Sequence, residues 1–147
     1  MRSVLWADDD SEEQLRGLVL ILKSRGVVIT DRVREYIRAR EILKQRSDDG
    51  VPFKALLVDM ILPYAPQKPS LHSYLGLRLA EDALTSGVQA IAFLSVVRQI
   101  EVSDKYRALQ VQFPAAKVAY FDKLALLEGN TIGELVGILS LGDIKKS

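Results

Sequence analysis

Short apolar runs alternate with longer amphipathic segments along this sequence, and that alternation constrains the fold more than any other feature. Each run is only a few residues long, and several are apolar at consecutive positions. Strands that are apolar on both faces are typical of parallel sheets covered by helices on both sides. We therefore expect five buried strands at residues 1–7, 27–30, 53–58, 90–94 and 117–121.

The segments between the runs have helical periodicity. Leu15, Leu18 and Leu22 recur at the spacing of one helical face, and helices are also expected over 33–43, 75–86, 102–111 and 131–141. Thr131 with Glu134 is typical of a helix N-terminus. Five strands that alternate with five helices predict an α/β fold, with a doubly wound five-stranded parallel sheet and helices on both faces.

Composition narrows the function classes. The chain has 147 residues, 48% of them apolar, which suits one domain with a sizeable core. Because 20 Lys and Arg oppose 19 Asp and Glu, bulk charge does not favour nucleic acid or a membrane surface. The lack of Cys and the single His exclude thiol catalysis and multi-histidine metal sites. No apolar run approaches the roughly 18 residues that span a bilayer. We expect a cytoplasmic protein.

Polar side chains follow the expected strands. Asp8 and Asp9 follow the first, Asp59 the third and Ser95 the fourth, while Lys123 lies just past the fifth. Parallel strands end at one edge of a sheet, where doubly wound folds bind ligands. Three neighbouring carboxylates repel one another unless a cation neutralises them, and an all-oxygen ligand set favours Mg²⁺. The sequence therefore predicts a magnesium site.

The same residues are suited to accept a phosphoryl group. Asp59 can attack phosphorus while a metal ion and the Lys123 ammonium offset the charge on the transferring oxygens. Ser95 can donate a hydrogen bond to the same group, and an aspartyl phosphate would draw it inward as a switch. Each side chain alone has an ordinary interpretation as a cap or a surface group. Their coincidence at strand ends favours a site.

Four segments carry a resemblance to a known family. VLWADDD, LLVDMILP, AFLS and YFDK occur in this order at the expected strand ends. In order and spacing they resemble the receiver domain of two-component response regulators, of the chemotaxis-regulator type, over essentially the whole chain. The resemblance implies a flavodoxin-like sheet with strand order 2-1-3-4-5 and a single receiver domain over residues 1–147.

The resemblance also implies roles for individual residues. Asp59 is the expected phospho-acceptor, with Lys123 and Ser95 beside it, and Asp8, Asp9 and Asp59 hold Mg²⁺ together with the backbone carbonyl of Ile61. Ser95 and Tyr120 form the expected switch.

The implied function is that of a stand-alone response regulator, which catalyses only its own phosphorylation and dephosphorylation. It takes phosphate from a histidine kinase or phosphotransfer protein. It then signals to a downstream protein through the face of the fourth helix, fifth strand and fifth helix, as a monomer or as a homodimer, without direct contact to nucleic acid or membrane.

The sequence departs from the family pattern at three places. Val96 follows the hydroxyl position, where the family has a small residue, and Leu124 follows the lysine, where the family has proline. The family's glycine lies about four residues beyond the strand-three proline, but Gly76 lies 13 beyond Pro63. We therefore expect an insertion at about residues 64–75, beside the site.

Two alternatives remain beside the leading hypothesis. The first is a pseudo-receiver, an interaction module that is not phosphorylated, in which Val96 and Leu124 mark a decayed site. The second is a hydrolase of the haloacid dehalogenase type, which also uses a strand-end Asp with Mg²⁺. That family needs a second Asp two residues later, where this chain has Ile61.

Overall fold

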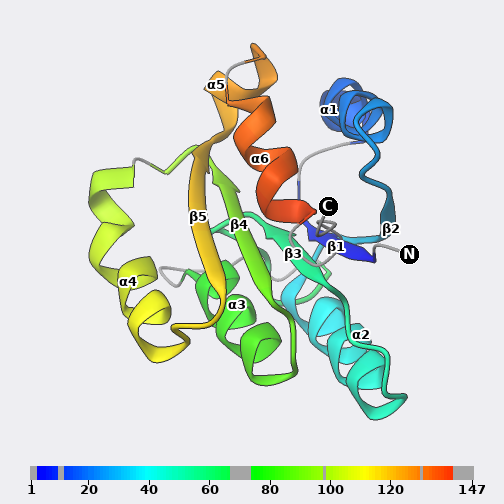
Figure 1. Cartoon of the computed structure of the whole chain (residues 1–147), viewed down its shortest axis with the longest axis vertical. Helices are drawn as coiled ribbons and strands as arrows, with labels where there is room; N and C mark the ends of the chain where they lie inside the picture. The colour runs from blue at the N-terminus through cyan, green and yellow to red at the C-terminus, as the bar shows by residue number, and fades with distance from the viewer. Residues whose placement is uncertain (1–2, 10–11, 67–73, 98, 130, 141–147) are drawn as a thin grey trace, which may run out of the picture.

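The computed structural model describes residues 3–9, 12–66, 74–97, 99–129 and 131–140. Within them lies a five-stranded sheet in the order β2-β1-β3-β4-β5, and every neighbouring pair is parallel (Figure 1). This confirms the predicted doubly wound fold and its strand order. The strands are β1 (Val4–Ala7), β2 (Ile29–Val33), β3 (Ala55–Val58), β4 (Ala90–Ser95) and β5 (Lys117–Asp122).

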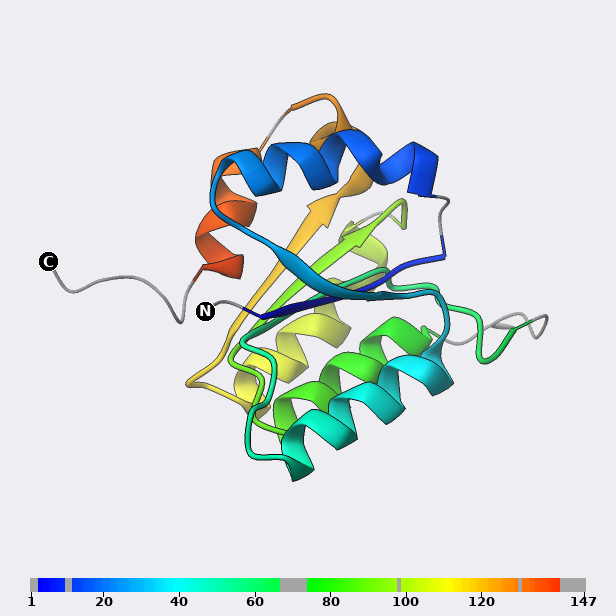
Figure 2. The ribbon, with the colours of Figure 1, turned by 90° about the vertical axis from the view of Figure 1, so that its right-hand side faces the viewer.

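Helices cover both faces of the sheet, and each face has its own apolar core (Figure 2). One face packs against α1 (Glu12–Ser24), α5 (Lys123–Leu127) and α6 (Ile132–Leu139), and the other against α2 (Tyr36–Asp48), α3 (Leu75–Thr85) and α4 (Gln99–Gln112). Trp6 and Leu57 enter the first core, whereas Leu5 and Leu56 enter the second. Strands buried on both sides need consecutive apolar residues. No helix among the described residues is long and apolar enough to cross a membrane.

The register of the strands places the polar residues of their ends side by side. The last residues of β1 and β3 are partners, so Asp8 and Asp59, which follow them, leave the sheet at the same level. Ser95 and Asp122 end β4 and β5 and are partners in the same way. Lys123 is the next residue. Four strands therefore bring the predicted site residues to one edge of the sheet.

The second strand lies later in the chain than predicted. The apolar run at 27–30 indicated a strand there, but the strand spans Ile29–Val33 and α2 begins correspondingly later. Asp31 and Arg32 interrupt the apolar pattern. An edge strand accepts such charges because it has a neighbour on one side only, and here the Arg32 guanidinium lies over the Trp6 ring, 5.5 Å from its centroid.

The chain after β5 also differs from the prediction, which had no helix at α5. Asp122 caps this helix, and its side chain accepts hydrogen bonds from the backbone N–H groups of Leu124 and Ala125 at 2.9 and 3.2 Å. Proline in place of Leu124 would lack the first of these donors. Thr131 begins α6 as predicted, but its φ is 60° and its side chain makes no capping hydrogen bond.

Both ends of the predicted insertion are fixed to the rest of the fold. Backbone N–H groups of Tyr36 and Ile37, in the first turn of α2, donate to the carbonyls of Pro63 and Tyr64 at 2.8 and 3.0 Å. The rings of Tyr36 and Tyr64 also stack, with centroids 6.1 Å apart. Residues 67–73 lie outside the described part of the chain.

Gly76, in the first turn of α3, lies against the backbone of Asp59. Its N–H donates to the Met60 carbonyl at 2.9 Å. A Cβ at this position would lie 1.8 Å from the carbonyl oxygen of Asp59, closer than any atom can approach without movement of the backbone. The absence of a side chain at residue 76 therefore lets α3 pack directly behind the predicted phospho-acceptor.

We predict that Gly76→Ala destabilises the protein by about 1–3 kcal/mol or more, because the added methyl overpacks a contact with backbone. The matched control is Gly137→Ala in α6, where an added Cβ meets nothing within 4 Å. That change should stabilise the helix by about 0.5–1 kcal/mol. Urea unfolding of both variants measures the difference, and equal free energies of unfolding would contradict the packing argument.

Candidate functional site

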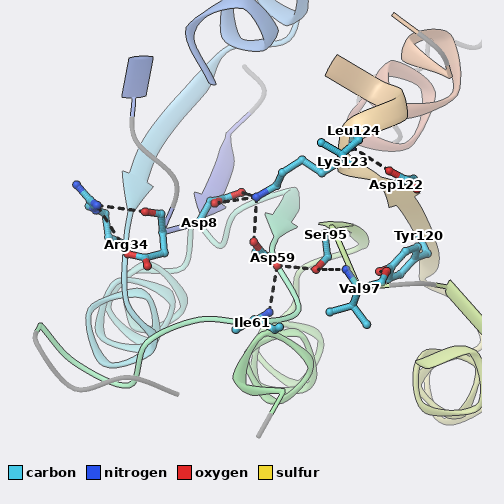
Figure 3. Close-up of polar contacts among 11 residues, drawn as sticks. Asp8, Arg34, Asp59, Ile61, Ser95, Val97, Tyr120, Asp122, Lys123 and Leu124 are labelled. Atoms are coloured by element: carbon cyan, nitrogen blue, oxygen red, sulfur yellow. Dashed lines mark hydrogen bonds and ion pairs between the residues drawn. The ribbon is translucent and has the colours of Figure 1, made fainter. Parts of the chain in front are cut away.

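Asp59 lies at the centre of a polar cluster at the ends of the strands (Figure 3). Asp59 is only 8% exposed. The Oδ1 atom accepts hydrogen bonds from the Ser95 hydroxyl at 2.7 Å and from the backbone N–H of Ile61 at 3.1 Å. The Oδ2 atom lies 2.9 Å from the Lys123 Nζ. Residues that follow or end three different strands thus converge on one carboxylate, as the sequence predicts.

Lys123 also contacts Asp8, so a single ammonium bridges two carboxylates. Its Nζ lies 3.1 and 2.9 Å from the two carboxylate oxygens of Asp8, and both side chains are almost completely buried. Figure 3 shows the lysine side chain reaching from the start of α5 to the space between Asp8 and Asp59. Removing two carboxylates from water is costly unless a partner neutralises them. Lys123 supplies that charge.

We predict that Lys123→Met destabilises the protein by about 3–5 kcal/mol, because two buried carboxylates then lose their ammonium partner. Lys44→Met is the matched control, since Lys44 pairs with Asp48 at 3.0 Å but is 77% exposed. Its effect should stay within about 0.5 kcal/mol. Urea unfolding at neutral pH compares the two, and a small loss for both variants would show that the buried bridge contributes little.

Asp9 contacts Arg34 and not the residues of this cluster. Its side chain is 55% exposed and faces Arg34, whose guanidinium lies 3.7 Å from Oδ1 and donates to the Asp9 carbonyl at 3.1 Å. Arg34 is the residue after β2. Among the residues that the structure describes, no group of three or more His, Cys, Asp or Glu side chains is close enough to hold a metal ion. The structure therefore joins Asp8 to Asp59 but not to Asp9.

The gathered side chains nevertheless suit a hard cation in charge and chemistry. Asp8 and Asp59 carry two formal negative charges against the single positive charge of Lys123. Their ligand atoms are carboxylate oxygens, which Mg²⁺ prefers. Ile61 donates its N–H to Asp59 and exposes 44% of its surface. Asp9 would bring a third carboxylate to this site by turning away from Arg34.

Tyr120 lies half-buried beside the hydroxyl of the cluster. Its ring stacks on that of Tyr106, with centroids 5.6 Å apart, and its hydroxyl donates to the carbonyl of Val97 in the loop after β4. Burial of the phenol raises the pKa of Tyr120 from 10.0 to about 12, and the charge of Asp59 adds to this rise, although contact with Ser95 opposes it. The predicted switch pair thus lies together.

The Tyr120 pKa predicts how stability depends on pH. In the unfolded chain this phenol loses its proton near pH 10, whereas in the folded protein it keeps the proton until about pH 12. Its contribution to stability is therefore complete below pH 10 and is lost as pH rises towards 12. Tyr120→Phe should remove this part of the alkaline loss. The free energy of unfolding between pH 9 and 12 measures it, and identical slopes for both proteins would contradict the assignment.

The chain is similar to solved structures of response regulators and their receiver domains. No protein-family model and no curated protein sequence matches this chain. Among solved structures, a DNA-binding response regulator of the LuxR family from Staphylococcus aureus is 13% identical with a TM-score of 0.62, covering 96% of this chain and 98% of that one. The response regulator domain of Thermotoga maritima CheB is 12% identical with a TM-score of 0.60, over 96% and 95% of the two chains. The non-phosphorylated receiver domain of RcsB from Escherichia coli is 13% identical with a TM-score of 0.60, over 96% and 94%.

These matches cover nearly the whole chain and agree with the observed strand order. The chain has the receiver-domain fold. At identities this low the likeness shows the fold alone.

Val96 and Leu124, which depart from the receiver pattern, both lie on the surface. Val96, directly after β4, is 60% exposed, and Leu124 in α5 is 62% exposed. Neither residue prevents Ser95 or Lys123 from reaching Asp59. The absence of the expected small residue and proline therefore leaves the central contacts of the cluster in place.

Sequence reasoning missed Arg34, Asp122 and the Val97 carbonyl as parts of this region. The sequence pattern gave no signal for Arg34, because it predicts the strand at 27–30 and a helix from residue 33, whereas β2 ends at Val33 and Arg34 follows it. Asp122 precedes the lysine and is a common N-cap residue. The carbonyl of Val97 is a backbone group, and the residue type carries no signal for it.

Proposed function

We propose that this chain is a response regulator receiver that accepts a phosphoryl group on Asp59 from a histidine kinase or phosphotransfer protein. The observation that carries the proposal is the convergence of Ser95 and Lys123 on the carboxylate of Asp59, at 2.7 and 2.9 Å. An ammonium and a hydroxyl beside a strand-end carboxylate suit phosphoryl transfer to an aspartate, because they offset or hydrogen-bond the charge on the transferring oxygens.

In the proposed reaction a carboxylate oxygen of Asp59 forms a bond to phosphorus. The bond from phosphorus to the donor's histidine nitrogen breaks, and that nitrogen keeps the electron pair and takes a proton from solvent. Lys123 stays close to the transferring oxygens and offsets their charge, while Ser95 donates a hydrogen bond to one of them. The burial of Asp59 limits the water that competes with the transfer.

Mg²⁺ would be held by Asp8, Asp59 and Asp9 together with the carbonyl of Ile61. When bound, it would supply positive charge at the phosphoryl oxygens, as metal ions do in phosphoryl transfer. Two of these carboxylates already lie at the cluster. Asp9 joins them in this proposal by exchanging its contact with Arg34 for the ion.

The switch that we propose runs through Ser95 and Tyr120. Ser95 already donates to Asp59, and Tyr120 holds the loop after β4 through the Val97 carbonyl. A phosphoryl group on Asp59 would change the hydrogen bond of Ser95 and, through this loop, the surface of α4 and β5. Together with α6, the helix expected over 131–141, these elements form the face that we propose for a downstream protein.

A second candidate function, a pseudo-receiver that is not phosphorylated, has one observation in its favour. Lys123 already pairs with both buried carboxylates, and Arg34 already faces Asp9. Such a site is largely neutralised by the chain itself. An interaction module would need no more than this, since its output surface would be fixed in one state.

We predict that acetyl phosphate with Mg²⁺ adds one phosphoryl group to the protein and that Asp59→Asn abolishes the addition. Asp104→Asn, which removes an exposed carboxylate in α4, should leave it unchanged. Intact mass spectrometry under conditions that preserve acyl phosphates measures all three proteins. Beryllofluoride, which imitates the phosphoryl group, should change the amide spectrum of the parent protein but not that of Asp59→Asn. No addition and no spectral change in the parent protein would favour the pseudo-receiver.

A further inference from the structure

Arg34 is an unassigned cation beside the candidate site. It follows Val33, the last residue of β2, and Val33 is the sheet partner of Ala7, the residue before Asp8. This register places the arginine next to the loop after β1. Figure 3 shows its side chain on the opposite side of Asp8 from Lys123. The chain therefore brings two cations to the acidic end of β1 from opposite sides.

Lys123 pairs with Asp8 and Asp59, whereas Arg34 faces Asp9. Lys123 lies within 3.1 Å of oxygens of Asp8 and Asp59 and is buried. Arg34 lies 3.7 Å from the Asp9 carboxylate and donates to the Asp9 carbonyl at 3.1 Å. The hydrogen bond from Arg34 to the Asp9 carbonyl ties the arginine to the backbone of Asp9 and keeps the guanidinium beside the Asp9 carboxylate. Arg34 thus contacts Asp9, the expected carboxylate ligand that lies outside the cluster.

We propose that Arg34 competes with a divalent cation for the carboxylate of Asp9 and so lowers the affinity of the site for Mg²⁺. This inference rests on the proposed function, because it takes Asp9 as a metal ligand. A carboxylate that faces a guanidinium must turn from it to bind the ion, and the bound ion is then also repelled by the guanidinium. Arg34 is a positioning residue in this scheme, and it touches neither phosphate nor Asp59.

The exposure of the pair sets the size of the effect. Arg34 and Asp9 are 60% and 55% exposed, and exposed ion pairs are worth only a fraction of a buried one. We therefore expect Arg34→Gln to tighten Mg²⁺ binding by roughly two- to fivefold. Because salt screens exposed charges, the difference should shrink as ionic strength rises. Arg34→Lys keeps the charge and should bind Mg²⁺ nearly as weakly as the parent protein.

Arg38→Gln is the matched control. Arg38 lies in the first turn of α2, is 59% exposed and pairs with Glu41 at 3.4 Å. The change removes the same charge from the same part of the molecule without altering the contact to Asp9. A merely structural role of Arg34 would change the melting temperature in both its Lys and Gln variants. Competition for Asp9 instead separates these two variants by their Mg²⁺ affinity.

The experiment is a Mg²⁺ titration of the full chain, followed by two-dimensional amide NMR, on the parent protein, Arg34→Gln, Arg34→Lys and Arg38→Gln. Tighter binding in Arg34→Gln alone, which disappears when Asp9→Asn is added, is the expected result. Equal affinities for Arg34→Gln and Arg38→Gln would overturn the inference while leaving the proposed function intact. Absence of Mg²⁺ binding in every protein would overturn both the inference and the metal part of the proposed function. A shifted affinity without phosphorylation of Asp59 would support the inference and count against the proposed transfer.

Discussion

The ammonium of Lys123, shared by two buried carboxylates, is the interaction on which the site depends. Asp8 and Asp59 come from neighbouring strands and are held at one level by the register of β1 and β3. Their mutual repulsion in a buried environment requires a cation between or beside them. Lys123, from the far end of the chain, supplies it and so links the first strand, the central strand and the start of α5. The Lys123 ammonium therefore both stabilises this edge of the sheet and sets the charge beside Asp59.

Much of the fold and the centre of the site could be predicted, for a physical reason. Within the predicted strands at 53–58 and 90–94, residues 55–58 and 90–94 are apolar at consecutive positions because helices cover both faces of the sheet. Once such strands are parallel, the polar residues that follow them must meet at one edge. Asp59 and Ser95 could be placed together on this basis, and the structure gives 2.7 Å between their oxygens.

The parts that could not be predicted depend on edges and on side-chain direction. β2 is an edge strand, so charged residues within it concealed its extent. The helix α5 is short and begins directly after β5, so it contains too few residues for a helical pattern of apolar side chains to be recognised in the sequence. The Asp9 side chain faces Arg34, a residue from another loop, and a pattern in the sequence does not fix the direction of either side chain.

The anchoring of the segment between β3 and α3 has a consequence for how the molecule tolerates change. Its first residues are tied to the amino end of α2 through the carbonyls of Pro63 and Tyr64, and its far end returns where Gly76 bonds to Met60. Because both ends are anchored by backbone hydrogen bonds, the length of the chain between them does not alter the position of β3 or of Asp59. The number of residues between these two anchors can therefore change, by evolution or by engineering, at little cost to the sheet.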